Sequence, residues 1–151
     1  MAPRPKSPTL RRLRFVDANV FLRYFTGSDP EKAACAKQLL ERVERGEERV
    51  TTDTLVIFET VFTLQRTYRV PKGQIREMIA DVFSLPGVQL RGKSLCLDAL
   101  DLYVERNVSF VAAYIAVLMK VRKLTEISSW DADFDQLPGL SRVEPAGSTN
   151  T

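Results

Sequence analysis

Histidine is absent from this chain of 151 residues. Its absence excludes general acid–base catalysis by histidine, Ser-His-Asp and Cys-His nucleophile systems, and histidine-ligated zinc. Cysteine is scarce, since Cys35 and Cys96 stand alone without the spacing of a metal site. We expect these two residues to be small buried side chains in a reduced compartment.

Long hydrophobic runs are also missing. The longest, residues 110–119, falls well short of the ~18 residues that a membrane span requires. The N-terminus lacks the apolar core of a signal peptide, so we expect a cytoplasmic protein. The chain is 44% hydrophobic and 27% charged, a composition and length that suit one domain with one core.

The net charge of +3 is unevenly distributed along the chain. The basic residues near the N-terminus are Arg4, Lys6, Arg11, Arg12 and Arg14, with no acid among them, so the rest of the chain is slightly acidic. We expect a basic flexible arm over residues 1–11, a domain over 12–145 and a flexible tail over 146–151. Arg11, Arg12 and Arg14 are candidates to bind an RNA backbone, and the alternative is a solubilising tail.

Strand-like and helix-like segments alternate along the chain. Strands are expected at 13–16, 49–52, 88–90, 126–129 and around Val143, and helices at 30–45, 75–83, 94–106 and 110–123. Propensity leaves 55–64 open between strand and helix. Alternation of this kind favours an α/β fold with a central, mostly parallel sheet that helices cover on both faces.

Acidic residues follow two of the expected strands. Asp17 ends the apolar run from Phe15, and Asp131 and Asp133 follow the strand at 126–129. Because ligands gather beyond the carboxyl ends of parallel strands, these acids are expected at one edge. Converging carboxylates suit Mg²⁺ or Mn²⁺, which can polarise a phosphate and activate water without histidine.

Each acid also has a structural alternative. Asp17 can cap the helix that follows it, while Asp131 and Asp133 can be turn and cap residues. Glu59 lies in a segment that is apolar on nearly all sides, where an unpaired carboxylate is disfavoured, so we consider it a further ligand or an acceptor for a metal-bound water. The alternative for Glu59 is the one wet face of a helix.

Four short motifs resemble the PIN-domain ribonucleases, and most closely their VapC-type toxins. They are Phe15-Val16-Asp17-Ala18-Asn19, Ile57-Phe58-Glu59, Asn107-Val108-Ser109-Phe110-Val111-Ala112-Ala113 and Ser129-Trp130-Asp131-Ala132-Asp133-Phe134, within a likeness that covers residues 12–145. The resemblance implies a three-layer α/β/α fold, a helix at 55–64 and metal-dependent endoribonuclease activity. It also implies Mg²⁺ or Mn²⁺ ligands at Asp17, Glu59 and Asp131, with Asp133 as a further candidate. A homodimer and an antitoxin whose tail covers the acidic cleft are implied as well.

The position of Ala112 is normally aspartate in that family. We therefore expect this form to be weakened or inactive, through either an engineered change or a natural loss. An aspartate there is expected to cost little stability, because the first turn of a helix favours a carboxylate. The alternative function is a non-catalytic RNA-binding or protein-interaction module. Asn19 and Ser129 are expected to orient the carboxylates, and Trp130 and Phe134 to pack in the core or at its rim.

Overall fold

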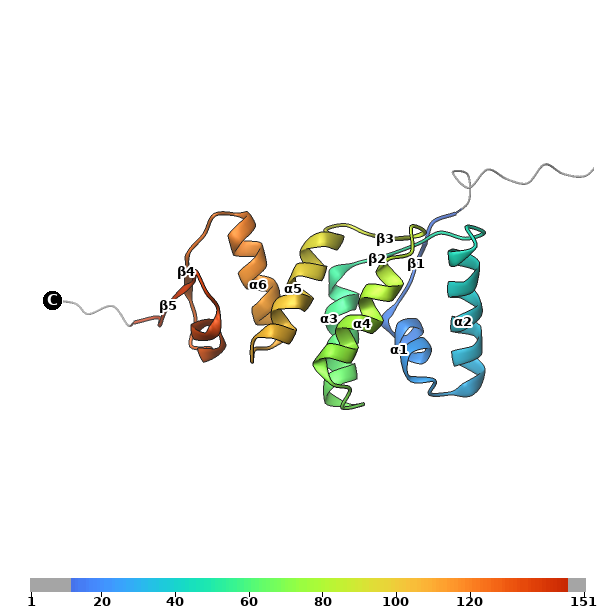
Figure 1. Ribbon diagram of the computed structural model, residues 1–151, viewed down its shortest axis with the longest axis horizontal. Helices are drawn as coiled ribbons and strands as arrows, with labels where there is room; N and C mark the ends of the chain where they lie inside the picture. The colour runs from blue at the N-terminus through green and yellow to red at the C-terminus, as the bar shows by residue number, and fades with distance from the viewer. Residues whose placement is uncertain (1–11, 147–151) are drawn as a thin grey trace, which may run out of the picture. The chain divides into compact units, whose positions relative to one another are not determined.

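The computed structural model describes residues 12–146, so the expected arm and residues 147–151 of the expected tail lie outside the described residues. The chain divides into two compact units with their boundary between Lys93 and Ser94. Figure 1 shows the order of the elements along both units. Among residues 12–146, no helix combines the length and the hydropathy needed to span a bilayer.

The N-terminal unit contains a parallel sheet and four helices. Its strands are β1 (Arg14–Phe15), β2 (Val50–Thr52) and β3 (Val88–Leu90), paired in the order β1-β2-β3. Its helices are α1 (Ala18–Thr26), α2 (Pro30–Glu44), α3 (Thr54–Arg66) and α4 (Lys72–Phe83). Helix α1 packs against α2 and α3, while α4 packs against α3 and β3.

One face of this sheet is buried and the other is partly open. Val50, Val88 and Leu90 are buried along one face, as the period-two alternation of strands requires. Thr51 and Gln89 are register partners on the other face, and both are half-buried. The sheet is therefore anchored through alternate residues of β2 and β3.

Two helix starts follow the capping signals in the sequence. Asp29 caps α2 by accepting a hydrogen bond from the Lys32 backbone N–H, and Asp53 caps α3 by accepting one from Leu55. Helix α1 was not assigned from the sequence, and it ends where Gly27 adopts φ 69°, with its N–H donating to the Arg23 carbonyl. These local signals fix where α1 ends and where α2 and α3 begin.

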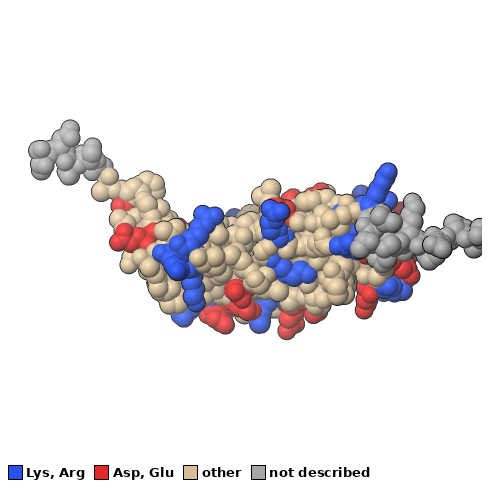
Figure 2. Space-filling model, turned by 90° about the horizontal axis from the view of Figure 1, so that it is seen from above, with Lys and Arg blue, Asp and Glu red and all other residues tan. Residues whose placement is uncertain are grey.

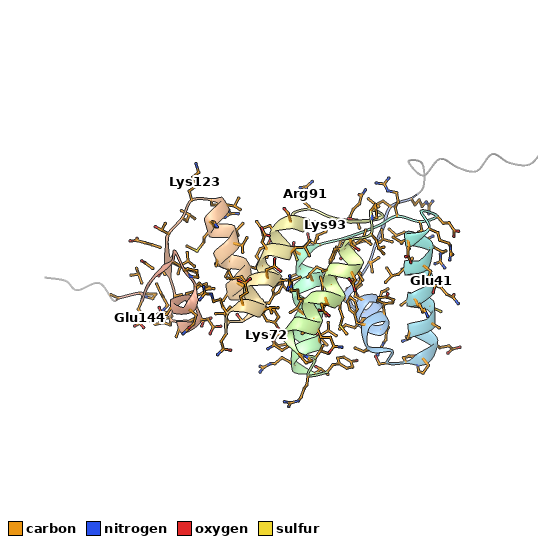
Figure 3. All side chains as sticks on the ribbon, viewed as in Figure 1. Glu41, Lys72, Arg91, Lys93, Lys123 and Glu144 are labelled. Atoms are coloured by element: carbon orange, nitrogen blue, oxygen red, sulfur yellow. The ribbon has the colours of Figure 1, made fainter. Side chains whose placement is uncertain are left out.

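The C-terminal unit contains two helices, a two-stranded parallel sheet and a 3₁₀ helix. Helices α5 (Lys93–Glu105) and α6 (Phe110–Val121) precede β4 (Glu126–Ser128), η2 (Ala132–Gln136) and β5 (Ser141–Val143). Strand β4 pairs with β5, and α6 packs against η2. Lys93, labelled in Figure 3, begins α5 but is the last residue of the N-terminal unit, and within that unit it donates from Nζ to the Val88 carbonyl oxygen at 2.8 Å.

The mixture of helices and parallel strands confirms the expected α/β class, and 55–64 is helical as the resemblance implies. Two packing expectations are wrong. Cys35 is exposed, and only Cys96 is buried. Phe134 is buried as expected, but Trp130 is 72% exposed and does not belong to the core.

Candidate functional site

The residues predicted to form the site are divided between the two units. Asp17, Asn19 and Glu59 belong to the N-terminal unit, whereas Ala112, Ser129, Asp131 and Asp133 belong to the C-terminal unit. The structure therefore defines two half-sites, each with its own geometry.

Asp17 lies directly beyond β1, after the buried Val16. It occupies the N-cap position of α1, as the structural alternative predicted, but its side chain makes no capping hydrogen bond. The carboxylate is exposed and forms no ion pair with a described lysine or arginine. Asn19 is exposed too and makes no hydrogen bond to Asp17. No direct contact therefore supports its predicted role in orienting that carboxylate.

Glu59 lies on the exposed side of α3. The expectation that it is surrounded by apolar side chains is wrong, because Ile57 and Thr60 point inward while Glu59 faces outward. Its helical neighbours on that side are hydrophobic, since Leu55 is 73% exposed and Phe62 is 60% exposed. Glu59 is thus a solvent-facing carboxylate within an apolar stripe, with no described lysine or arginine paired to it.

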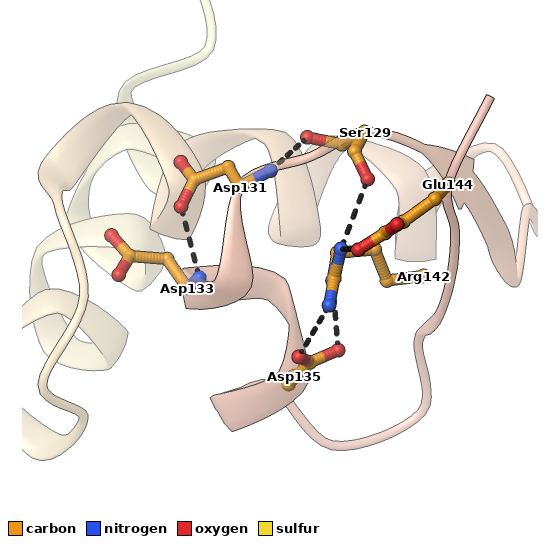
Figure 4. Close-up of polar contacts among 6 residues, drawn as sticks. All are labelled: Ser129, Asp131, Asp133, Asp135, Arg142 and Glu144. Carbon is orange, nitrogen blue, oxygen red and sulfur yellow. Dashed lines mark hydrogen bonds and ion pairs between the residues drawn. The ribbon is translucent and has the colours of Figure 1, made fainter.

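The turn after β4 is ordered by hydrogen bonds of its own (Figure 4). The Ser129 hydroxyl accepts from the Asp131 backbone N–H at 2.9 Å, and Asp131 Oδ1 accepts from the Asp133 backbone N–H at 2.9 Å. Asp131 is therefore both the cap of η2 and an exposed carboxylate whose Oδ2 contacts no described hydrogen-bond donor. Ser129 contacts the backbone of Asp131 and not its carboxylate, so its expected role in orienting that carboxylate stays a prediction.

Asp133 connects this turn to the start of α6. Its Oδ2 accepts from the Ser109 backbone N–H at 2.9 Å, while the Ser109 hydroxyl accepts from the Ala112 backbone N–H at 3.1 Å. A carboxylate at a helix N-terminus is stabilised by the helix dipole. Asp133 thus has a structural partner in Ser109, and position 112 lies three residues after Ser109.

Ala112 is only 1% exposed, and Ala113 is fully buried. Small side chains at these positions let α6 approach its neighbours closely, as their residue type suggested. The methyl group of Ala112 supplies no oxygen, so within the C-terminal unit Asp131 and Asp133 are the acids near the start of α6.

Arg142 was not singled out from the sequence. From β5 it donates Nε and Nη2 to the two carboxylate oxygens of Asp135, at 3.0 and 2.9 Å, and Nη1 to Glu144 at 2.9 Å and to the Ser129 carbonyl oxygen at 3.3 Å. These partners raise the pKa of Arg142 further, and the bond from Arg142 lowers the pKa of Asp135. In the sequence, the role of Arg142 is indicated by nothing more than its place between two residues of a short strand, Ser141 and Val143.

The basic candidates are only partly described. Arg11 lies outside the described residues, Arg12 and Arg14 are exposed, and Arg14 Nη1 lies 3.7 Å from Oε1 of the half-buried Glu48. On the face drawn in Figure 2, lysine and arginine side chains are interspersed with acids. An RNA-binding role for Arg12 and Arg14 remains a prediction.

Carboxylate oxygens are suitable donors for a hard divalent cation, and the exposed Asp17, Glu59 and Asp131 supply them. Within residues 12–146, no three acids, cysteines or histidines lie together as a metal-binding group. The donor chemistry of each half-site suits a hard divalent cation.

A family model described as the PIN domain matches residues 14–140. The chain belongs to the PIN domain family. The matched region includes both half-sites. This confirms the family inferred from the four motifs.

Two further comparisons found similar proteins. A VapC ribonuclease of Aquifex aeolicus (strain VF5) is 24% identical over 133 residues, which cover 88% of this chain and 97% of that protein. The crystal structure of Mycobacterium tuberculosis VapC20, described as a Sarcin-Ricin loop cleaving toxin, is 24% identical and matches 87% of this chain and 98% of its own, with a TM-score of 0.39.

Proposed function

We propose that this PIN-domain protein is a Mg²⁺- or Mn²⁺-dependent endoribonuclease of the VapC toxin type, with Asp17, Glu59 and Asp131 as its metal-binding acids. The family match and the similarity to a VapC ribonuclease support the nuclease class. One observation carries the proposal. Asp17 and Asp131 each follow a parallel strand, and both are exposed carboxylates that form no ion pair with a described lysine or arginine. By contrast, Asp135 and Glu144 are both paired with Arg142.

A bound divalent cation supplies charge stabilisation at the phosphate and a more acidic water. Asp17 and Asp131 would hold it, and Ser129 fixes the backbone of Asp131 for that purpose. Because the chain has no histidine, we assign the proton of the attacking water to a carboxylate. Glu59 is the candidate acceptor, since it is exposed and unpaired with a described lysine or arginine.

Ala112 should weaken this activity. Affinity for a hard cation depends on the number of charged ligands, and this chain has one fewer than the family pattern implies. Ala112 is buried and offers no ligand oxygen. It therefore favours a second candidate, a non-catalytic RNA-binding or protein-interaction module on the PIN fold. The two functions differ in whether a divalent cation binds.

The partners proposed for the nuclease are an RNA substrate, an antitoxin protein and a second copy of the chain. An antitoxin can neutralise exposed, unpaired carboxylates with an arginine, since such charge-assisted bonds are strong and specific. The basic arm would add RNA affinity without sequence choice, so that deleting residues 1–11 weakens binding and lowers its salt dependence.

Thermal unfolding with and without Mn²⁺ tests the proposal, because preferential binding to the native state raises Tm. Mn²⁺ should raise Tm of the unmodified chain and have no effect on Asp17→Asn or Asp131→Asn. Asp81→Asn is the matched control, since Asp81 is an exposed acid of α4 outside the proposed site. A Tm that is insensitive to Mn²⁺ in all four proteins would favour the non-catalytic module.

A further inference from the structure

Arg142 connects both ends of the turn that carries Asp131. It leaves β5 with a side chain that is only 15% exposed. Its Nη1 donates to the Ser129 carbonyl oxygen just after β4, while Nε and Nη2 donate to the Asp135 carboxylate within η2 (Figure 4). The acidic residues of the turn lie between these two attachment points.

The bond to Asp135 uses the planar fork of the guanidinium. Two parallel N–H groups meet two carboxylate oxygens at 3.0 and 2.9 Å, an arrangement that fixes orientation as well as distance. Lysine has the charge but lacks the fork, so it cannot reproduce this geometry. The position therefore uses a property specific to arginine.

The route from Arg142 to the Asp131 backbone is short. Arg142 fixes the Ser129 carbonyl, and the hydroxyl of the same Ser129 accepts from the Asp131 N–H. On the other side, Asp131 Oδ1 is held by the Asp133 N–H, so the rotation of the carboxylate is restricted. The orientation of the remaining oxygen, Oδ2, is therefore set by these hydrogen bonds within the protein, before any ligand binds.

A second bidentate pair in the molecule shows what an ordinary surface contact looks like. Arg45 donates Nε and Nη2 to Glu47 at 3.0 and 3.3 Å, but its side chain is 55% exposed and its partner is two residues away. Exposed pairs of this kind contribute little. Arg142 differs because it joins β5, η2 and the end of β4.

We propose that Arg142 is a positioning residue that holds the turn 129–135 in one conformation, so that Asp131 presents Oδ2 to a cation before either cation or RNA arrives. This inference rests on the proposed function only in taking Asp131 as a metal-binding acid. Groups that orient a metal ligand typically change affinity by about 10- to 100-fold when they are removed.

The first measurement follows the turn itself in the full chain without metal. NMR amide exchange at Asp131 and Asp133 should become faster in Arg142→Gln, in Arg142→Lys and in Asp135→Asn, and the fluorescence anisotropy of Trp130, the one tryptophan of the sequence, should fall. Arg45→Gln is the matched control and should change neither quantity. If Arg142→Gln does not fold, Asp135→Asn breaks the same bidentate bond and retains the arginine.

The second measurement is Mn²⁺ affinity by calorimetric titration. Arg142→Gln and Arg142→Lys should both bind Mn²⁺ about 10- to 100-fold more weakly, whereas Arg45→Gln should bind as the unmodified chain does. A role of charge alone would be restored by lysine, and full affinity in Arg142→Lys would overturn the proposal.

The remaining outcomes separate the two hypotheses. Unchanged amide exchange in Arg142→Gln and Asp135→Asn overturns the positioning role. Unchanged Mn²⁺ affinity in Arg142→Gln, together with loss of binding in Asp131→Asn, overturns it too and leaves the proposed function standing. If Asp131→Asn binds Mn²⁺ normally, the metal site itself is wrong, and the positioning role fails with it.

Discussion

The Asp133 carboxylate accepts a hydrogen bond from the Ser109 backbone N–H, which lies 24 residues earlier in the chain. Ser109 is the N-cap of α6, and position 112 is the third residue of that helix. In a capping box, an acid or amide at the third position reaches back to this same N–H. Here the position holds alanine, and Asp133 supplies the acceptor from another element.

Removing this acceptor should weaken the C-terminal unit. We expect Asp133→Ala to lower the free energy of unfolding by about 0.5–2 kcal/mol, because it removes an exposed hydrogen bond from the carboxylate to the Ser109 N–H at the start of α6. Asp133→Asn retains an oxygen acceptor and should cost less. Urea denaturation measures both, with Asp81→Ala as the control for loss of an exposed acid, and equal stability of all three variants would contradict the expectation.

Ala112→Asp should cost more stability than the sequence suggested. Position 112 is almost fully buried, so a carboxylate there loses hydration and also meets the charge of Asp133. We expect Tm to fall without metal and to recover with Mn²⁺, together with a gain in metal-dependent RNA cleavage. In Ala116→Asp, a buried position one turn further along α6, Tm should fall without recovery. Equal recovery in both variants would mean that position 112 is not the missing ligand.

The protein should lose stability at alkaline pH through Cys96. Burial raises the pKa of its thiol to about 12, whereas a thiol in the unfolded chain has a pKa of ~8.5. Above that lower value the unfolded state releases a proton that the native state retains, so the free energy of unfolding falls as pH rises toward 12. Cys96→Ala should reduce this slope in urea denaturation series from pH 8 to 10, whereas the same substitution at the exposed Cys35 should leave it unchanged.

Trp130 is a candidate to stack on a base of the RNA. It is exposed next to Asp131, and an aromatic face of this kind contributes about 1–3 kcal/mol per stacked base. Single-stranded RNA should quench its fluorescence, and Trp130→Ala should weaken binding while Trp130→Phe retains most of it. Tyr68→Ala, another exposed aromatic, is the control. Binding that is equal in Trp130→Ala and the unmodified chain would exclude this contact.

Local chemistry made part of the fold predictable. Asp29, Asp53 and Ser109 were recognisable as caps because a cap bonds to a residue two or three positions away. The family motifs are local in the same way, since each is a short segment that contains one of the predicted acids or the position of Ala112. Helix α1 was one alternative after Asp17 but received no bounds, because its aromatic and β-branched residues also suit a strand.

Properties that depend on orientation or on distant contacts were not predictable. Glu59 follows Ile57 and Phe58 closely in sequence, but successive helical residues point about 100° apart, so apolar neighbours did not imply burial. The partners of Arg142 lie up to 13 residues away and are brought together only when β4 pairs with β5. A single sequence contains no local signal for such a contact.

The pairing of β4 with β5 also limits how this region can vary in length. Parallel neighbours require a connection of about a dozen residues or more, usually with an α-helix, and here residues 129–140 make it with only the short η2. The connection is already about as short as a parallel crossover allows, so it has no spare residues that could compensate for a deletion. Deletions within it should therefore separate the two strands and displace the acids together, whereas the same deletions in a longer crossover would be absorbed.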